Sequence, residues 1–433
     1  MEWTKWQIKN GFWSVFFLGI NGIVGSGIFL LPGKIYAQAG NFDVGLIVIA
    51  AIATLLIALC FADMASRFTG DGAAWLYTYN AFGRLPGFEI GFFSWLQGII
   101  TIAAEVAAFL STLATLFPDV LKTGWYQTIG IGLIVVLALI NLVGADFSDI
   151  ADNISSVTKV FVLGMFVLIG IWMIHPTFLT NAPQHSFGDL NQSFNSVFYM
   201  FSGFTFLPVA ANNMVNPKKN LPKALIAVIV AVTAIYALVQ VTAVGLLGGQ
   251  IAQSNAPVAV AFAQVLGPVG KLIIVLGMLV SILGVAISVT FSTPYIASSL
   301  ATEHQLLPKF LGQTNKGGVP VTAIIFTTAI SSLLLLSGDY LFLVACVVIV
   351  ALVQYIATGL ATIKIQRVDK SDHDGWRLPG GWIIPVIAIL VSIYIAFSVS
   401  TTVLLFGLAS IIVGLLLYAL DWYIEKNRKQ AQH

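Results

Sequence analysis

Long apolar runs dominate the chain, and polar residues gather in the short segments between them. A helix that crosses a membrane needs roughly 20 mostly apolar residues. On that basis the pattern predicts twelve spans, at about residues 12–37, 44–66, 87–116, 126–144, 153–175, 192–214, 222–247, 268–300, 320–337, 340–363, 382–400 and 402–423. The third and eighth are long, which predicts tilt or a turn outside the membrane. No connecting segment is long enough for a soluble domain, so residues 1–433 are expected to form one integral membrane domain.

Composition supports the membrane class. Hydrophobic residues make up 58% of the chain and charged residues 9%, against about 45–50% and 25% in soluble domains. The mean hydropathy is +0.94, and a net charge of +2 does not indicate a nucleic-acid partner. Cys60 and Cys346 both lie in apolar runs, where a thiol usually serves packing. We therefore expect no disulfide and no metal site.

The basic residues predict the orientation of the chain. With the N-terminus inside the cell, most Lys and Arg residues fall in segments on the cytoplasmic side. The opposite side carries only Lys34, Lys122 and Lys271, and Lys159 falls within a span. Because cytoplasmic loops are enriched in Lys and Arg, this bias predicts a multi-pass protein of the cell membrane with both termini in the cytoplasm.

The first span contains an unusual cluster of glycines, in the stretch "NGIVGSGIFLLPG" from Asn21 to Gly33. Each glycine inside a helix costs about 1 kcal/mol relative to alanine. Such a cluster either lets two helices pack closely or marks a break in the helix. Unwound backbone survives in hydrocarbon only where it lines a cavity or is buried in protein, so a break would indicate a site.

The sixth span carries a second interruption, in "YMFSGFTFLPVAANN", where Pro208 removes a helical hydrogen bond. Two interrupted spans in corresponding positions indicate inverted repeats, here of five helices each, with a binding site near mid-membrane. A broken helix exposes N–H groups at one new end and carbonyl groups at the other. The N–H end suits a carboxylate and the carbonyl end suits an ammonium, so the pair fits a zwitterionic amino acid.

Several motifs resemble those of the amino acid permeases of the amino acid–polyamine–organocation superfamily. They are "GSGIF", "ADMASRFTGDGAAWLYTYNAFG", "FSGF", "NPKKNLPKAL" and "LLPKFLGQTNKGGVPVTA", and they cover about residues 12–335. The resemblance implies an all-α membrane protein that works by alternating access. Its core would be two inverted repeats over about 12–365, with two peripheral helices over about 382–424. No cofactor is implied. The substrate-binding residues that it implies are Ile23, Gly25, Ser26, Gly27, Ile28, Phe201, Ser202, Gly203 and Phe204.

Lys159 in the fifth span has two interpretations. Its amine extends to the membrane surface, or it points into the bundle. Similar proton-linked permeases have a lysine there whose amine takes the place of a sodium ion. In that second case the expected partners are the carbonyl of Gly22 and the hydroxyls of Ser281 and Ser288, which share one face of the eighth span.

Glu105 lies near the middle of the third span among apolar neighbours. A carboxyl group at that depth is a functional candidate. It carries a proton, receives the amine of a basic substrate, or is a protonated acid bonded to a neighbouring helix. In similar carriers of cationic amino acids the acidic residue of this helix falls nearer Gln97, which is neutral. That difference favours neutral substrates.

The combined prediction is a secondary active transporter of amino acids, either proton-coupled or working by exchange. The alternatives are an antiporter of an amino acid against its amine, a basic amino acid permease, and an amino acid sensor without transport. The chain has no HExxH, GxSxG or P-loop motif, so we do not expect an enzyme. The expected partners are an amino acid, membrane lipid and, in the proton-coupled case, a proton. The sequence leaves the oligomeric state open.

Overall fold

The computed structural model of the protein describes residues 12–68, 72–122, 124–143, 145–180, 187–205, 207, 214–302, 306–315, 318–337, 339–368 and 376–430. Within these residues the chain is a bundle of helices without a strand. Pro208, which contributed to the predicted break in the sixth span, lies outside the described residues.

The helices follow the predicted spans closely. They are α1 (Phe12–Ile23), α2 (Gly27–Leu30), α3 (Pro32–Ala39), α4 (Asp43–Arg67), α5 (Ala73–Phe82), α6 (Arg84–Leu113), α7 (Trp125–Val143), α8 (Ala145–Gly170), α9 (Pro176–Thr180), α10 (Phe187–Met200), α12 (Pro217–Leu247), α13 (Pro257–Thr302), α14 (Val321–Ser337), α15 (Tyr340–Val368), α16 (Ile383–Phe397) and α17 (Thr401–Gln430). Gly267, with φ of 63°, interrupts α13 just before the predicted start of the eighth span.

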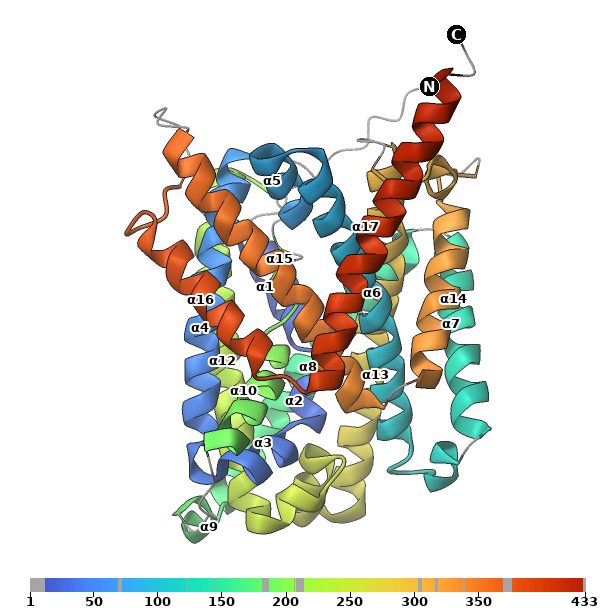
Figure 1. Ribbon diagram of the computed structural model, residues 1–433. Coiled ribbons are helices and arrows are strands. Elements are labelled where there is room, and N and C mark those ends of the chain that lie inside the picture. The colour runs from blue at the N-terminus through green and yellow to red at the C-terminus, as the bar shows by residue number, and fades with distance from the viewer. Residues whose placement is uncertain are drawn as a thin grey trace.

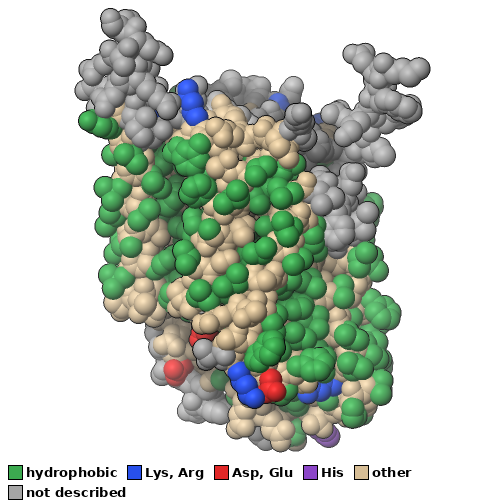
Figure 2. Space-filling view, turned by 90° about the vertical axis from the view of Figure 1, so that its right-hand side faces the viewer, with side chains coloured by type: hydrophobic (Ala, Val, Ile, Leu, Met, Phe, Trp, Pro, Cys, Tyr) green, Lys and Arg blue, Asp and Glu red, His purple; other side chains and the backbone are tan. Residues whose placement is uncertain are grey.

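Membrane-spanning capacity is clearest for the long helices. Among the described residues, eight helical segments are long and apolar enough to cross a membrane, and α14 and α16 are shorter apolar helices. The prediction of twelve spans is therefore supported in part, because the two interrupted spans do not form single long helices. Figure 2 shows one face on which hydrophobic side chains cover the middle, while charged side chains lie toward the two ends. This is the surface of a multi-pass membrane protein.

Helices α4, α6, α13 and α15 are the most deeply buried of the long helices. Helix α13 packs against both α6 and α8, while α12 packs against α1 and α4. Helices α16 and α17 lie on the outside of the bundle, against α15 (Figure 1). The two inverted repeats remain a prediction.

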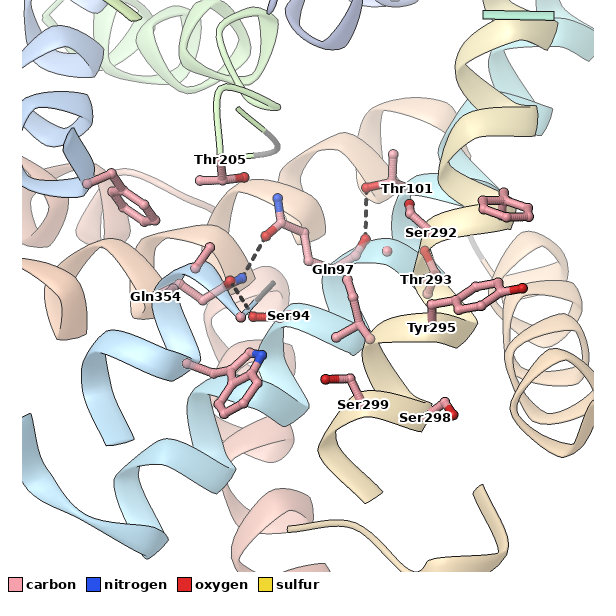
Figure 3. A pocket seen from close by; sticks show the side chains of 18 of the residues that line it. Ser94, Gln97, Thr101, Thr205, Ser292, Thr293, Tyr295, Ser298, Ser299 and Gln354 are labelled. Carbon is pink, nitrogen blue, oxygen red and sulfur yellow. Dashed lines mark hydrogen bonds between the residues drawn. The ribbon is translucent and has the colours of Figure 1, made fainter. Parts of the chain in front are cut away.

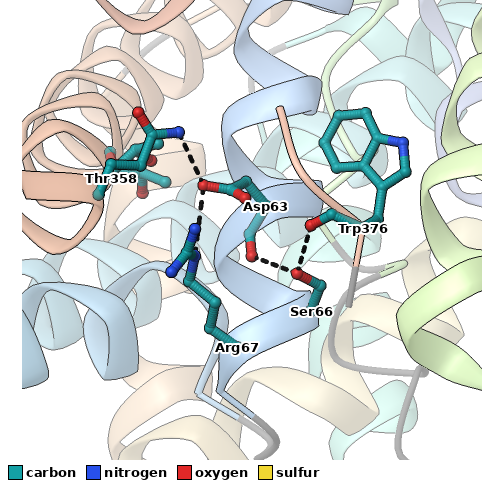
Figure 4. Close-up of polar contacts among 7 residues, drawn as sticks. Asp63, Ser66, Arg67, Thr358 and Trp376 are labelled. Carbon is teal, nitrogen blue, oxygen red and sulfur yellow. Dashed lines mark hydrogen bonds and ion pairs between the residues drawn. The ribbon is translucent and has the colours of Figure 1, made fainter. Parts of the chain in front are cut away.

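A buried polar cluster lies at the end of the bundle that carries α5, at the top of Figure 1. The fully buried Asp63 on α4 accepts a hydrogen bond of 3.0 Å from Gln366 on α15, and its Oδ2 lies 3.5 Å from Nε of Arg67. The hydroxyl of Ser66 lies 2.8 Å and 2.9 Å from the carbonyl oxygens of Asp63 and Trp376 (Figure 4). The "ADMASRF" motif thus joins α4 to α15 and to the segment before α16.

Candidate functional site

The first predicted span is broken at the glycine cluster, as expected. Helix α1 ends at Ile23, residues 24–26 are not helical, and α2 begins at Gly27. Helix α2 restarts with N–H groups that have no acceptor inside their own helix, as at any helix start. These donors face the break and are suited to an anionic group.

The carbonyl end of α1 is held by side chains from two other helices. The ammonium of Lys159, on α8, donates hydrogen bonds of 3.1 Å and 2.7 Å to the carbonyl oxygens of Asn21 and Val24. The hydroxyl of Tyr236, on α12, lies 3.0 Å from the carbonyl oxygen of Ile23. Because carbonyls at a helix end need donors, these contacts stabilise the broken conformation.

The sixth predicted span is interrupted at the same depth. Helix α10 ends at Met200, and residues 201–205 form turns. Gly203 has φ of +100°, and a Cβ atom there would lie 2.2 Å from the carbonyl oxygen of Gly22. Only glycine therefore fits where the two interrupted segments meet. Tyr236 also joins them, since its hydroxyl lies 2.8 Å from the carbonyl oxygen of Met200.

A cavity of about 420 Å³ lies beside both interruptions, and we call it the break cavity. Its volume falls in the range of small-molecule sites, about 300–1,000 Å³. It is lined by Leu18, Gly19, Asn21, Gly22, Ile23, Gly25, Gly27, Gln97, Thr101, Glu105, Tyr199, Met200, Ser202, Gly203, Leu207, Val285, Ser288, Val289 and Ser292. Backbone at glycines makes up much of one wall, so a ligand can approach the main chain there without obstruction.

Glu105 reaches directly into the break of the first span. Its Oε1 accepts a hydrogen bond of 2.9 Å from the hydroxyl of Ser26 and one of 3.3 Å from the hydroxyl of Tyr199. The hydroxyl of Tyr340, on α15, donates in turn to Ser26 at 3.1 Å. Glu105 is 2% exposed, and its Oε2 has no hydrogen-bond partner among the described residues. A buried carboxyl group with a free oxygen at the site is equipped to bind a proton or a polar ligand group.

A second cavity, of about 460 Å³, adjoins the first and extends to α5. Figure 3 shows the side chains that line it, which are mostly hydroxyl and amide groups. We call it the glutamine cavity, because it is lined by Gln97 and Gln354, with Nε2 of Gln354 donating to Oε1 of Gln97 at 2.6 Å. The two cavities share Gln97, Thr101 and Ser292. Together they form a continuous space from the break toward the end of the bundle that carries α5.

The structure divides the residues expected at the substrate site into two groups. Ile23, Gly25, Gly27, Ser202 and Gly203 line the break cavity, whereas Ser26, Ile28, Phe201 and Phe204 do not. Those four are almost fully buried. The two phenylalanines pack against tyrosines instead of lining the cavity. The ring of Phe201 lies 5.3 Å from that of Tyr236, and the ring of Phe204 lies 5.3 Å from that of Tyr355.

The second set of predicted residues needs one correction. Gly22, Gln97, Glu105 and Ser288 line the break cavity. Ser288 also donates to the carbonyl of Gly284 in its own helix, at 3.0 Å. The predicted contact of Ser281 with Lys159 is wrong, because the Ser281 hydroxyl has no hydrogen-bond partner among the described residues.

Lys159 is fully buried, which is not the geometry of an amine that extends to the membrane surface. Two hydrogen bonds of its ammonium go to the carbonyl oxygens of Asn21 and Val24, which lie close to the predicted acceptor Gly22 in the chain. The helical period predicted the face of the eighth span that Ser281 occupies, but not the rotation of that helix relative to α8.

Three tyrosines were missed by sequence reasoning: Tyr199, Tyr236 and Tyr340. Each places its hydroxyl at an interrupted segment or on the Glu105 cluster. A usable signal was present, because a buried tyrosine hydroxyl usually requires a polar partner. A tyrosine at the centre of the apolar segment "VTAIYALVQ" therefore indicates a polar group nearby.

Comparison with known proteins gives a consistent result over nearly the whole chain. A family model described as amino acid permease matches residues 11–420. An uncharacterised transporter of Mycobacterium tuberculosis is 32% identical, over 90% of this chain and 87% of the relative. The serine/threonine exchanger SteT of Bacillus subtilis is 25% identical, over 92% of both chains. The branched-chain amino acid permease BcaP of Bacillus subtilis is 26% identical, over 96% of this chain and 92% of the relative.

Proposed function

This chain belongs to the amino acid permease family, and we propose that it is a secondary active transporter of neutral amino acids. The observation that carries the proposal is the break cavity, where the start of α2 and the turns after α10 face the same space. SteT is named for serine and threonine, whereas BcaP is named for branched-chain amino acids. Because these names do not agree on one kind of side chain, we base the choice of substrate on this chain's own residues.

The backbone groups of an amino acid match the two interruptions. In our proposal the α-carboxylate binds the free N–H groups at the start of α2, next to Gly25 and Gly27. The α-ammonium binds carbonyl oxygens of the turns after α10, where Ser202 and Gly203 line the cavity. Gly25 matters because a Cβ there would lie 3.3 Å from the Glu105 carboxyl, on the side that the substrate would approach.

Alternating access would follow from the contacts that tie the two interrupted spans to their neighbours. Lys159 holds the end of α1 to α8, and Tyr236 holds both interruptions to α12. A contact made in only one conformation contributes its full free energy to the balance between the two. We propose that these contacts hold the site open toward the glutamine cavity and are released when it opens to the other side.

Glu105 is the residue that we assign to coupling. A substrate carboxylate at the start of α2 would lie close to the Glu105 carboxyl, which Ser26 holds at the break. Two carboxylates at such a distance repel strongly unless one of them carries a proton. Binding of an amino acid would thus favour binding of a proton at Glu105.

Neutral substrates are favoured by the charges of the cavities. Among the described residues that line the two cavities, Glu105 is the one with a charged side-chain type. It already accepts bonds from Ser26 and Tyr199 at the break. A cationic side chain extending into the glutamine cavity would find no carboxylate there, and an unpaired buried charge is costly.

The test is uptake by the purified protein in liposomes. We expect saturable, concentrative uptake of labelled neutral amino acids when the outside is more acidic. Uptake that needs an internal amino acid instead would indicate exchange, and counterflow of an amino acid with its amine would indicate the antiporter. Saturable binding without any flux would contradict the proposal and favour a sensor. A reporter at either terminus would test the proposed cytoplasmic location of both ends.

A further inference from the structure

One face of α6 connects the two cavities. Gln97, Thr101 and Glu105 are spaced four residues apart, so they lie on one side of the helix, and all three line the break cavity. Eight residues of helix rise about 12 Å. Gln97 therefore lies about two turns nearer to the end of the bundle that carries α5 than Glu105 does, at the entrance to the glutamine cavity.

Gln97 is held in place by a chain of polar groups. Gln354 donates to its Oε1, and the hydroxyl of Ser94 lies 2.8 Å from Oε1 of Gln354. In this arrangement the amide nitrogen of Gln97 points away from Gln354, into the cavity (Figure 3). The amide group of Gln97 is thus held in one orientation relative to the cavity.

The orientation of the Gln354 amide is set by its neighbours. Its Nε2 also lies 3.5 Å from the carbonyl oxygens of Phe93 and Val350. Turning this amide over would bring its own oxygen against these two acceptors, and two acceptors cannot pair. Gln97 therefore keeps its Oε1 toward Gln354 and presents its N–H groups to the cavity, where an uncharged acceptor such as a carboxamide oxygen pairs with them.

We propose that Gln97 binds the side-chain carboxamide of the transported amino acid, so that glutamine, and next to it asparagine, are the preferred substrates. This inference rests on the proposed function. Aliphatic and cationic side chains leave the N–H groups of Gln97 unpaired, and a site built to hydrogen-bond a polar group discriminates against analogues that lack it.

The length of the site fits glutamine best. From a carboxylate oxygen to the terminal atoms of its amide, an extended glutamine spans about 6 Å. Hydrogen bonds of about 3 Å at each end bring the total to about 12 Å, close to the rise between positions 105 and 97 along α6. The hydroxyl oxygen of serine ends two bonds earlier. Asparagine is one bond shorter than glutamine.

The first experiment is a substrate panel on the full-length protein in liposomes, with labelled glutamine, asparagine, alanine, serine, leucine and lysine. We expect the highest kcat/KM for glutamine and the next highest for asparagine. Uptake in which serine, leucine or lysine exceeds glutamine would overturn the inference while leaving amino acid transport intact. Absence of uptake for every amino acid would instead contradict the proposed function.

Variants of Gln97 test its role directly. Gln97→Leu should lower kcat/KM for glutamine about tenfold, the loss of one to two hydrogen bonds, and should lower that for alanine clearly less, because alanine does not reach Gln97. Gln97→Glu keeps the acceptor for Gln354 but adds a negative charge, so it should gain uptake of lysine. An equal loss for glutamine and alanine would overturn the inference.

The control is Gln127→Leu, the same chemical change at an exposed position of α7, which should leave the panel unchanged. A second readout, which does not need flux, is glutamine binding measured through the increase in thermal stability of the detergent-purified protein. In this measurement, Gln97→Leu should weaken glutamine binding about tenfold. Unchanged glutamine binding would overturn the inference even for a protein that binds without transporting.

Discussion

The hydroxyl of Ser26, inside the break of the first span, donates a hydrogen bond of 2.9 Å to the carboxyl group of Glu105 in the middle of α6. The two residues are 79 positions apart in the chain. This contact brings a protonatable group to the place where the helix presents its free N–H groups. It is the physical basis for coupling in the proposed mechanism.

Glu105→Gln should separate coupling from transport. The amide keeps an oxygen that accepts from Ser26 and Tyr199, so exchange of the preferred substrate should persist. The amide of this glutamine cannot gain or lose a proton, so accumulation driven by an acidic outside should fail. The measurements are counterflow at equal pH and uptake under a pH gradient. Glu89→Gln is the matched control, because Glu89 is on the same helix but lies against Gly414 of α17. Normal accumulation by Glu105→Gln would remove this residue from coupling.

Lys159→Met should retain binding and lose concentrative uptake. Methionine replaces most of the buried stem but cannot donate to the carbonyls of Asn21 and Val24. Each hydrogen bond from a charged group contributes about 1.5–3 kcal/mol, enough to shift the balance between conformations more than tenfold. Binding and uptake are measured separately. Lys271→Met, which removes an amine bonded to the carbonyl of Thr115, should accumulate substrate normally. Equal behaviour of the two variants would contradict the assigned role.

Tyr236→Phe should weaken the structure at both interruptions. Its hydroxyl is shared between the carbonyl oxygens of Ile23 and Met200, and its loss leaves buried acceptors unsatisfied at a cost of about 1–3 kcal/mol. We expect a lower Tm and a severalfold higher KM. Tyr355→Phe is the control, because the buried Tyr355 hydroxyl has no hydrogen-bond partner among the described residues. A Tm change no larger than the control's would count against the shared contact.

Gly203→Ala should abolish transport by displacing the two interrupted segments. Alanine at φ of +100° is strained by about 1–2 kcal/mol, and its Cβ would meet the Gly22 carbonyl oxygen at 2.2 Å. Backbone cannot move away as a flexible side chain can. Gly132→Ala, where a Cβ meets nothing within 4 Å, should be neutral or slightly stabilising. Uptake and Tm of both variants check this, and wild-type uptake by Gly203→Ala would contradict it.

Local chemistry made much of the fold predictable. Apolar runs predicted the positions of most helices because a chain in hydrocarbon must satisfy its backbone within each helix. Because of the same requirement, the glycines at Gly25 and Gly27 predicted a break in the first span. The motifs around them indicated the permease family. These features depend on neighbours along the chain, so the sequence carries them directly.

The tertiary structure alone decided which groups meet at the break and in the cavities. Glu105 and Gln97 were predicted to matter, but their partners Ser26 and Gln354 come from other helices, Gln354 from 257 positions away. The predicted contact between Lys159 and Ser281 failed for the same reason. Helical periodicity determines which residues share a face, whereas the rotation and depth of each helix are set by packing against all its neighbours at once. Hydrogen bonds act over about 3 Å, so a rotation that the periodicity leaves undetermined is enough to change every partner.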